Sequence, residues 1–115
     1  MIELELPYPP SVNHYWRHVG TRVLISRQGR VYREQVSAIL AARRITPING
    51  ALTVHVKIFP PDRRRRDLDN TQKALLDALG NGGAYGDDSQ IEKLVIEKLD
   101  VVPGGKATVR IEEIS

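Results

Sequence analysis

The sequence predicts a single α+β domain over residues 1–115, in which four to five β-strands accompany two α-helices. Apolar and polar residues alternate at 2–6 and again at 52–59, as in strands that bury one face. Apolar residues recur at helical spacing within 30–44 and within 67–80. A chain of 115 residues is long enough for one modest hydrophobic core.

The N-terminal strand is expected to stop at Pro7 and to lead into a loop at residues 11–18. This loop is rich in polar and aromatic side chains, which are able to stack on bases and to touch phosphates. The alternative is that Tyr15 and Trp16 plug one end of the core. The sequence leaves both interpretations open.

The middle of the chain predicts a brief strand at 23–25, with Ser26 as a possible N-cap for the helix at 30–44. The residues from Thr46 to Gly50 break that helix. The strand at 52–59 follows and ends at two prolines, so the arginines after them lie on a loop.

The second helix is expected to begin between Asp67 and Asn70 and to end at Gly80, a suitable C-terminal cap. A glycine-rich connection at 81–90 follows, and then a strand at 91–101. Residues 103–105 are expected to form a hairpin turn into a closing strand at 107–111.

The composition of the chain excludes several classes of protein and favours an anionic partner. The chain has no cysteine, which excludes disulfides and cysteine-ligated metal centres. It shows neither a signal peptide nor an apolar run of membrane-spanning length, so we expect an intracellular protein with no membrane contact. The formal net charge is +3, and residues 57–73 carry the same excess, which favours a polyanionic partner that binds there.

Four consecutive arginines run directly into the sequence Asp67-Leu68-Asp69-Asn70. Arginine forks bind phosphates, while carboxylates are hard oxygen ligands of the kind that Mg²⁺ prefers. With Asp88 as a third carboxylate, we expect one or two metal ions that activate water against a phosphodiester. Lys73, one turn into the helix, is expected to contact the scissile phosphate, to assist the deprotonation of water or to donate a proton to the leaving group.

Simpler roles compete with this interpretation. Aspartates are common at helix starts and in turns, so capping explains Asp67, Asp69 or the Asp87-Asp88 pair taken singly. Lys73 is spaced to form an ordinary surface ion pair with Asp69 or Asp77. The combination of several carboxylates with dense positive charge is what favours a nuclease.

The chain resembles the RusA family of Holliday junction resolvases. The similarity covers essentially the whole chain and rests on the following segments: Pro9 to His18, Gly29 with Tyr32-Arg33, Pro61 to Asn70 with Gln72-Lys73, and Asp87 to Gln90. The resemblance implies an α+β fold with a mixed sheet, a homodimer, and magnesium-dependent nicking of four-way DNA junctions, with manganese as a substitute metal and no organic cofactor. It also implies a role in DNA recombination and repair in the cytoplasm of a bacterium or phage-infected cell, in some cases from a prophage.

The expected site residues follow from the motifs and the resemblance together. The catalytic set is Asp67, Asp69, Asp88 and Lys73, of which the three aspartates are also the metal ligands. Asn70 and Asp87 are possible auxiliary residues. The expected DNA contacts are Asn13, Tyr15, Arg17, His18, Arg63, Arg64, Arg65 and Arg66.

Two other functions are considered. A phosphatase of the haloacid dehalogenase type also uses Asp-x-Asp, but it places the motif directly after a buried strand in a larger domain. A binding module for nucleic acid without catalysis explains the basic and aromatic residues, although carboxylates beside a polyanion weaken pure binding unless a cation bridges them.

Overall fold

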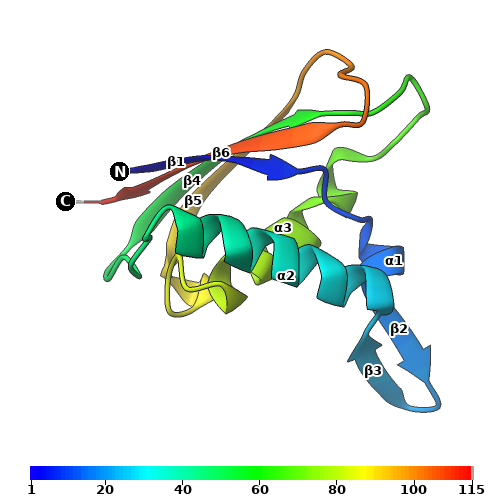
Figure 1. Ribbon diagram of the computed structural model, residues 1–115, viewed down its shortest axis with the longest axis horizontal. Helices are drawn as coiled ribbons and strands as arrows, with labels where there is room; N and C mark the ends of the chain where they lie inside the picture. Colours follow the sequence, from blue (N-terminus) through cyan, green and yellow to red (C-terminus); the bar gives the residue numbers. More distant parts are fainter. Residues whose placement is uncertain (115) are drawn as a thin grey trace.

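The computed structural model describes residues 1–114 and confirms the α+β fold. A four-stranded mixed sheet has the order β1-β6-β4-β5, and a separate two-stranded sheet is formed by β2 and β3 (Figure 1). β1 pairs antiparallel with β6, β6 antiparallel with β4, and β4 parallel with β5. The strands are β1 (Ile2–Pro7), β2 (Trp16–Val19), β3 (Arg22–Ile25), β4 (Leu52–Phe59), β5 (Ile91–Lys98) and β6 (Lys106–Glu113).

Two longer helices cover one face of the four-stranded sheet, with α2 in front of α3 in Figure 1. The helical segments are α1 (Val12–Tyr15), α2 (Arg27–Ala42), α3 (Gln72–Asn81) and the short 3-10 helices η1 (Leu68–Asn70) and η2 (Asp88–Gln90). Ser26 caps α2 as predicted, because its side chain accepts a hydrogen bond from the Gly29 amide at 3.0 Å. None of the helices is long and apolar enough to cross a membrane, as far as residues 1–114 show.

The core lies between this sheet face and the two helices. The alternating strand residues predicted from the sequence are buried on β4, where Leu52, Val54, Val56 and Ile58 are at most 2% exposed. α2 and α3 contribute apolar residues to the same cluster. Burial of these side chains supplies most of the driving force for folding. The helix at 72–81 thereby becomes a fixed platform for the residues at its two ends.

Two boundaries of the second helix differ from the prediction. The chain first makes the 3-10 turn η1, and α3 then extends to Asn81 with Gly82 at the C-cap. Gly80 therefore lies inside the helix. A Cβ atom there would approach the Tyr85 ring to 3.2 Å, so Gly80 serves close packing rather than termination.

The expected loop at residues 11–18 is wrong. Residues 12–15 form the short helix α1, and residues 16–19 form β2, which pairs with β3 in a hairpin that projects from the body of the molecule (Figure 1). The signal was obscured because the strands of the hairpin are only four residues long and carry mixed side chains.

The expected hairpin between the last two strands is also wrong. β5 and β6 lie on opposite sides of β4, so they are not hydrogen-bonded neighbours. The turn at Gly104 and Gly105 exists, with positive φ at both residues. It nevertheless closes a longer connection, residues 99–105, that carries the chain past β4 to the start of β6. A turn-forming sequence does not distinguish this connection from a hairpin.

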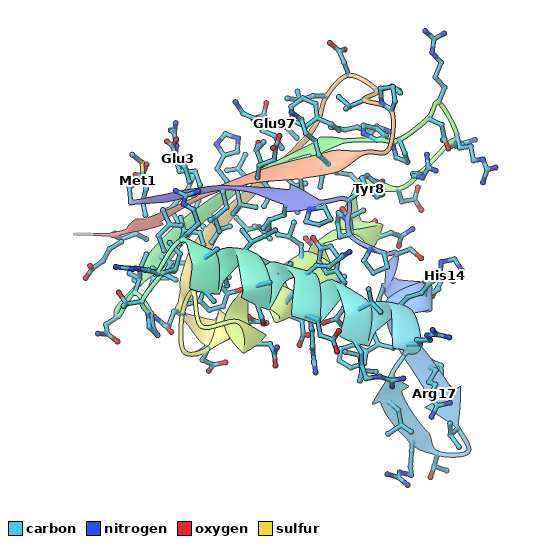
Figure 2. All side chains as sticks on the ribbon, viewed as in Figure 1. Met1, Glu3, Tyr8, His14, Arg17 and Glu97 are labelled. Carbon is cyan, nitrogen blue, oxygen red and sulfur yellow. The ribbon has the colours of Figure 1, made fainter. Side chains whose placement is uncertain are left out.

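The second face of the sheet is polar. Glu3 and Glu97 point away from the helices in Figure 2. Glu3 pairs with Arg110 at 3.3 Å, and His55 pairs with Glu97 across β4 and β5. His55 therefore has a structural partner on the face of the sheet away from the helices.

Candidate active site

The arginine run lies on the loop between β4 and η1, and Asp62 holds this loop in shape. The Asp62 carboxylate accepts hydrogen bonds from the Arg64 amide at 2.9 Å and from both terminal nitrogens of Arg66, at 2.5 and 3.1 Å. These contacts, led by the Arg66 guanidinium, lower the pKa of Asp62 to about 2. Arg66 is thus committed to an internal fork, whereas Arg63, Arg64 and Arg65 are exposed.

Asp67 and Asp69 are presented on η1, immediately before α3. Asp67 occupies the N-cap position of η1, but its side chain makes no capping hydrogen bond to the part of the chain that the structure describes. The turn is held instead by the Thr71 hydroxyl, which donates to the Leu68 carbonyl at 3.0 Å. Both carboxylates are exposed. The simpler capping role therefore does not account for Asp67.

Lys73 lies one turn into α3 and is exposed. Asp77, its expected ion-pair partner four residues on, pairs instead with Arg33 of α2 at 2.8 Å. In the part of the chain that the structure describes, Asp77 therefore does not serve as the ion-pair partner of Lys73.

Asp88 begins η2, close to the C-terminal end of α3. A Cβ atom at Gly80 would lie 3.6 Å from Oδ1 of Asp88. Partial burial is the main cause that raises the pKa of Asp88, and the negative charges of Asp77 and Asp87 raise it further. The Tyr85 hydroxyl lies close enough to oppose this shift, and it also donates to the Leu76 carbonyl at 2.5 Å. A carboxylate in such surroundings favours a nearby cation.

Asp87 has a different role from its neighbour. Its side chain caps η2 in a reciprocal capping box with Gln90, and it accepts a hydrogen bond from the Ser89 hydroxyl at 2.6 Å, which lowers its pKa. Gln90 also donates to the carbonyls of Ile48 and Gly50, both at 2.9 Å. Capping, one of the two interpretations from the sequence, describes Asp87 and explains how η2 is fixed beside the start of β4.

The three aspartates of the expected metal site do not converge within one chain. η1 adjoins the N-terminal end of α3 and η2 its C-terminal end, and a helix of 10 residues is about 15 Å long. No group of three or more His, Asp or Glu side chains in residues 1–114 is arranged to hold a metal ion. The expectation that Asp88 lies beside Asp67 and Asp69 is therefore wrong for a single protomer.

A network that the sequence analysis missed lies between the two helices. The Arg33 Nε atom donates to Asp77 at 2.8 Å and to the Tyr15 hydroxyl at 3.0 Å, and Tyr15 also donates to Asp77. Tyr15 is fully buried, so its ring is not accessible for stacking on a base and the earlier assignment as a DNA contact is corrected. The spacing of Arg33 and Asp77 along two helices gave no signal for this pairing.

The remaining expected DNA contacts lie on the surface. Asn13, Arg17 and His18 are exposed, and Arg17 lies on the projecting hairpin in Figure 2. Alternation along β2 and β3 places Arg17 and Arg22 on one face of the hairpin. Their positions leave them open to a partner but do not identify it.

Comparison with known proteins assigns the family. The family model described as endodeoxyribonuclease RusA matches residues 7–112. Similar proteins include crossover junction endodeoxyribonucleases RusA from Enterobacteria phage 82, 42% identical, and from Escherichia coli strain K12, 41% identical, each over 96% of this chain and 93% of the relative. A further one from Enterobacteria phage HK97 is 40% identical over 95% of this chain and 92% of the relative. The chain therefore belongs to the RusA family of endodeoxyribonucleases.

Proposed function

We propose that this protein is a structure-selective endonuclease that resolves four-way DNA junctions by paired, symmetric nicks. The observation that carries the proposal is the arrangement around α3, where the exposed arginine loop lies with Asp67 and Asp69 at one end and Asp88 lies at the other. The names of the relatives, crossover junction endodeoxyribonucleases, support the same substrate.

The residues have distinct roles in this proposal. Arg63, Arg64 and Arg65 hold the DNA backbone through phosphate contacts. Lys73 stabilises negative charge on the scissile phosphate. Its ammonium is available for this role because Asp77, the carboxylate four residues on, pairs with Arg33 instead. Asp67, Asp69 and Asp88 supply oxygen donors of the type that Mg²⁺ or Mn²⁺ accepts.

A divalent cation does not fit the three aspartates of one protomer, since α3 separates them. We propose that the protein acts as a homodimer and that pairing brings Asp88 of one protomer toward Asp67 and Asp69 of the other. A two-fold dimer also suits a symmetric junction that needs two equivalent incisions.

The separation of the aspartates favours one alternative, a junction-binding protein without catalysis. The deciding experiment incubates purified protein with a labelled four-way junction or a linear duplex of equal length, in Mg²⁺, Mn²⁺ or chelator. We expect cleavage of the junction alone, only with metal, and its loss in Asp69→Asn while junction binding persists. Asp100→Asn, which makes the same change at an exposed aspartate of the loop between β5 and β6, is the matched control.

Binding of the junction without cleavage under any metal condition would establish the alternative. Equal cleavage by Asp69→Asn and the unsubstituted protein would remove Asp69 from the catalytic set.

A further inference from the structure

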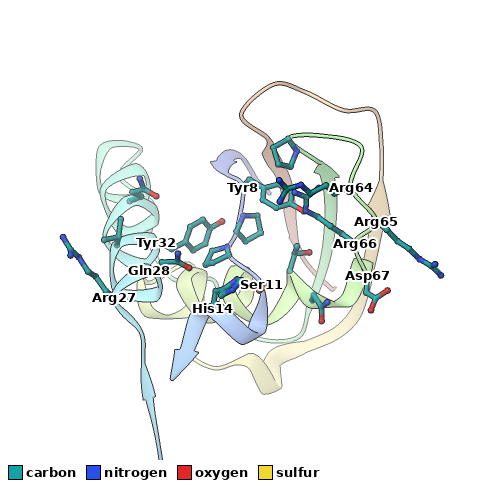
Figure 3. A pocket seen from close by; sticks show the side chains of 17 residues that line it. Tyr8, Ser11, His14, Arg27, Gln28, Tyr32, Arg64, Arg65, Arg66 and Asp67 are labelled. Carbon is teal, nitrogen blue, oxygen red and sulfur yellow. Dashed lines mark hydrogen bonds between the residues drawn. The ribbon is translucent and has the colours of Figure 1, made fainter. Parts of the chain in front are cut away.

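A large open groove lies between α2 and the arginine loop, away from Asp88 and the C-terminal end of α3. Its volume is about 1060 Å³. Figure 3 shows Arg27, Gln28 and Tyr32 of α2 on one side, Arg64 and Arg66 on the other, and Ser11 and His14 between them. This is the upper size range of small-ligand sites and too small to seat the full width of a duplex.

The groove is strongly basic. Its lining contains four arginines, Arg27, Arg64, Arg65 and Arg66, against the single carboxylate of Asp67. Arg66 is partly neutralised by Asp62, but Arg27 and Arg65 are exposed and Arg64 has a side chain that is 83% exposed. An anionic occupant is therefore favoured over an apolar or cationic one.

The floor adds flat apolar surface to this charge. Tyr8 and Pro10 contribute this surface, and the Arg66 guanidinium lies 6.0 Å from the centre of the Tyr8 ring. The hydroxyl of Tyr32 donates to the Pro7 carbonyl at 2.9 Å, which fixes the floor against α2. Flat rings beside arginines are the usual means by which proteins bind unpaired nucleotides without sequence preference.

The groove also reaches the candidate catalytic residues, because Asp67 and Asn70 line one end of it. A nucleic-acid strand that follows the groove would arrive at η1. Gln28 and Gln35 on the α2 side offer hydrogen bonds to phosphate or sugar oxygens. Polar, aromatic and basic groups thus line one continuous path to the same place.

We propose that this groove binds a single nucleic-acid strand, a few unpaired nucleotides long, and guides it to Asp67. The proposal builds on the proposed function, since an opened junction supplies such a strand. It assigns DNA contacts to α2 that neither the arginine motif nor the hairpin predicts, with Arg27 as the main phosphate contact.

The test uses charge reversal on the two ends of one helix. Fluorescence anisotropy measures binding of a labelled ten-nucleotide single strand in chelator at several salt concentrations. Arg27→Glu should weaken binding roughly tenfold and lower the slope of affinity against salt by about 1. Arg43→Glu makes the same charge change at the other end of α2, about 24 Å away, and should have a much smaller effect. Glutamate in the first turn of a helix suits the helix dipole, so the Arg27 variant is expected to fold.

A second measurement uses the absence of cysteine from the chain. A photo-crosslinker is attached at Val31→Cys, in the groove, or at Ala42→Cys, exposed on the same helix outside it. Crosslinking of the strand from Val31→Cys but not from Ala42→Cys supports the path. Equal crosslinking from both positions, or equal affinity of Arg27→Glu and Arg43→Glu, overturns it.

The outcomes separate the groove from the proposed function. Junction cleavage with no effect of Arg27→Glu on strand binding retains the nuclease and rejects the groove. Strand binding that depends on Arg27, without cleavage of any junction, retains the groove and rejects the nuclease. Conversion of a dimer to a monomer by Arg27→Glu, seen by light scattering, would identify the groove as an interface between copies and reject the strand.

Discussion

The two ends of α3 carry the same residue type in opposite situations. At the N-terminal end, Asp67 and Asp69 are exposed on a short turn, and the Asp67 side chain makes no capping hydrogen bond within the described chain. At the C-terminal end, the Asp87 side chain forms a capping box with Gln90. Burial and neighbouring carboxylates raise the pKa of Asp88. An aspartate motif therefore identifies candidates, and only the hydrogen bonds around each carboxylate separate structural from reactive ones.

The largest effect is expected from removing the negative charge of Asp88 and, separately, that of its neighbour Asp87. Asp88→Asn should lower the rate of junction cleavage by roughly 100-fold or more, because it removes a charge required in the site. Asp87→Asn should cleave at nearly the normal rate, since asparagine caps about as well as aspartate. Cleavage rates with equal junction binding provide the measurement. Similar losses in both variants would show that the two aspartates are not distinct.

Mixing variants tests whether the two ends meet between protomers. A 1:1 mixture of Asp69→Asn and Asp88→Asn proteins, refolded together, contains mixed dimers with one complete composite site. We expect nicking to recover to roughly a quarter of the normal number of active sites, although each variant alone is inactive. No recovery, with mixed dimers verified by mass, would place all three aspartates in one protomer after a movement of the chain.

The arginine loop, at the N-terminal end of α3, should account for most of the salt dependence of junction affinity. Alanine at both Arg63 and Arg64 should flatten the dependence of junction affinity on salt by about 2 in log–log slope, because each exposed arginine contacts a phosphate. Titration of labelled junction at several salt concentrations measures it. An unchanged slope would remove these arginines from the DNA contact surface.

The smallest effect is expected from the cap itself. Asp87→Ala should lower the urea concentration at the midpoint of unfolding slightly, since the capping box of η2 is lost. Asp87→Asn is the matched control and should be close to neutral. Urea denaturation followed by circular dichroism gives both values. A larger loss in the asparagine variant would mean that the charge of Asp87, rather than its cap, stabilises the fold.

Much of the fold was predictable because alternation and helical spacing are local signals. The strand at 52–59 was found in this way with the bounds that the structure has, and the helix expected at 30–44 runs from Arg27 to Ala42. The order of the strands was not predictable, because the Gly104-Gly105 turn is compatible with both a hairpin and a crossing past β4. The residues of α1 were missed because a helix of four residues has too few positions to show a period.

The candidate site was predictable in its residues but not in its assembly. The arginine run and the aspartates stand out by charge density, yet nothing local shows that Arg66 is held by Asp62. The pairing of Arg33 with Asp77 depends on how α2 crosses α3, which is a property of packing. The separation of Asp88 from Asp67 depends on the length of α3. The helical spacing in the sequence indicates this length, but the aspartate motif by itself says nothing about distance.

The central position of β6 has a consequence for synthesis. β6 follows the other strands of the domain along the chain, yet it lies between β1 and β4, and every residue of β1 pairs with it. During translation β1 therefore waits, without a partner in the sheet, until β6 has left the ribosome. Assembly of the sheet is then a late event, and loss of β6 would leave both β1 and β4 with unpaired edges open to aggregation.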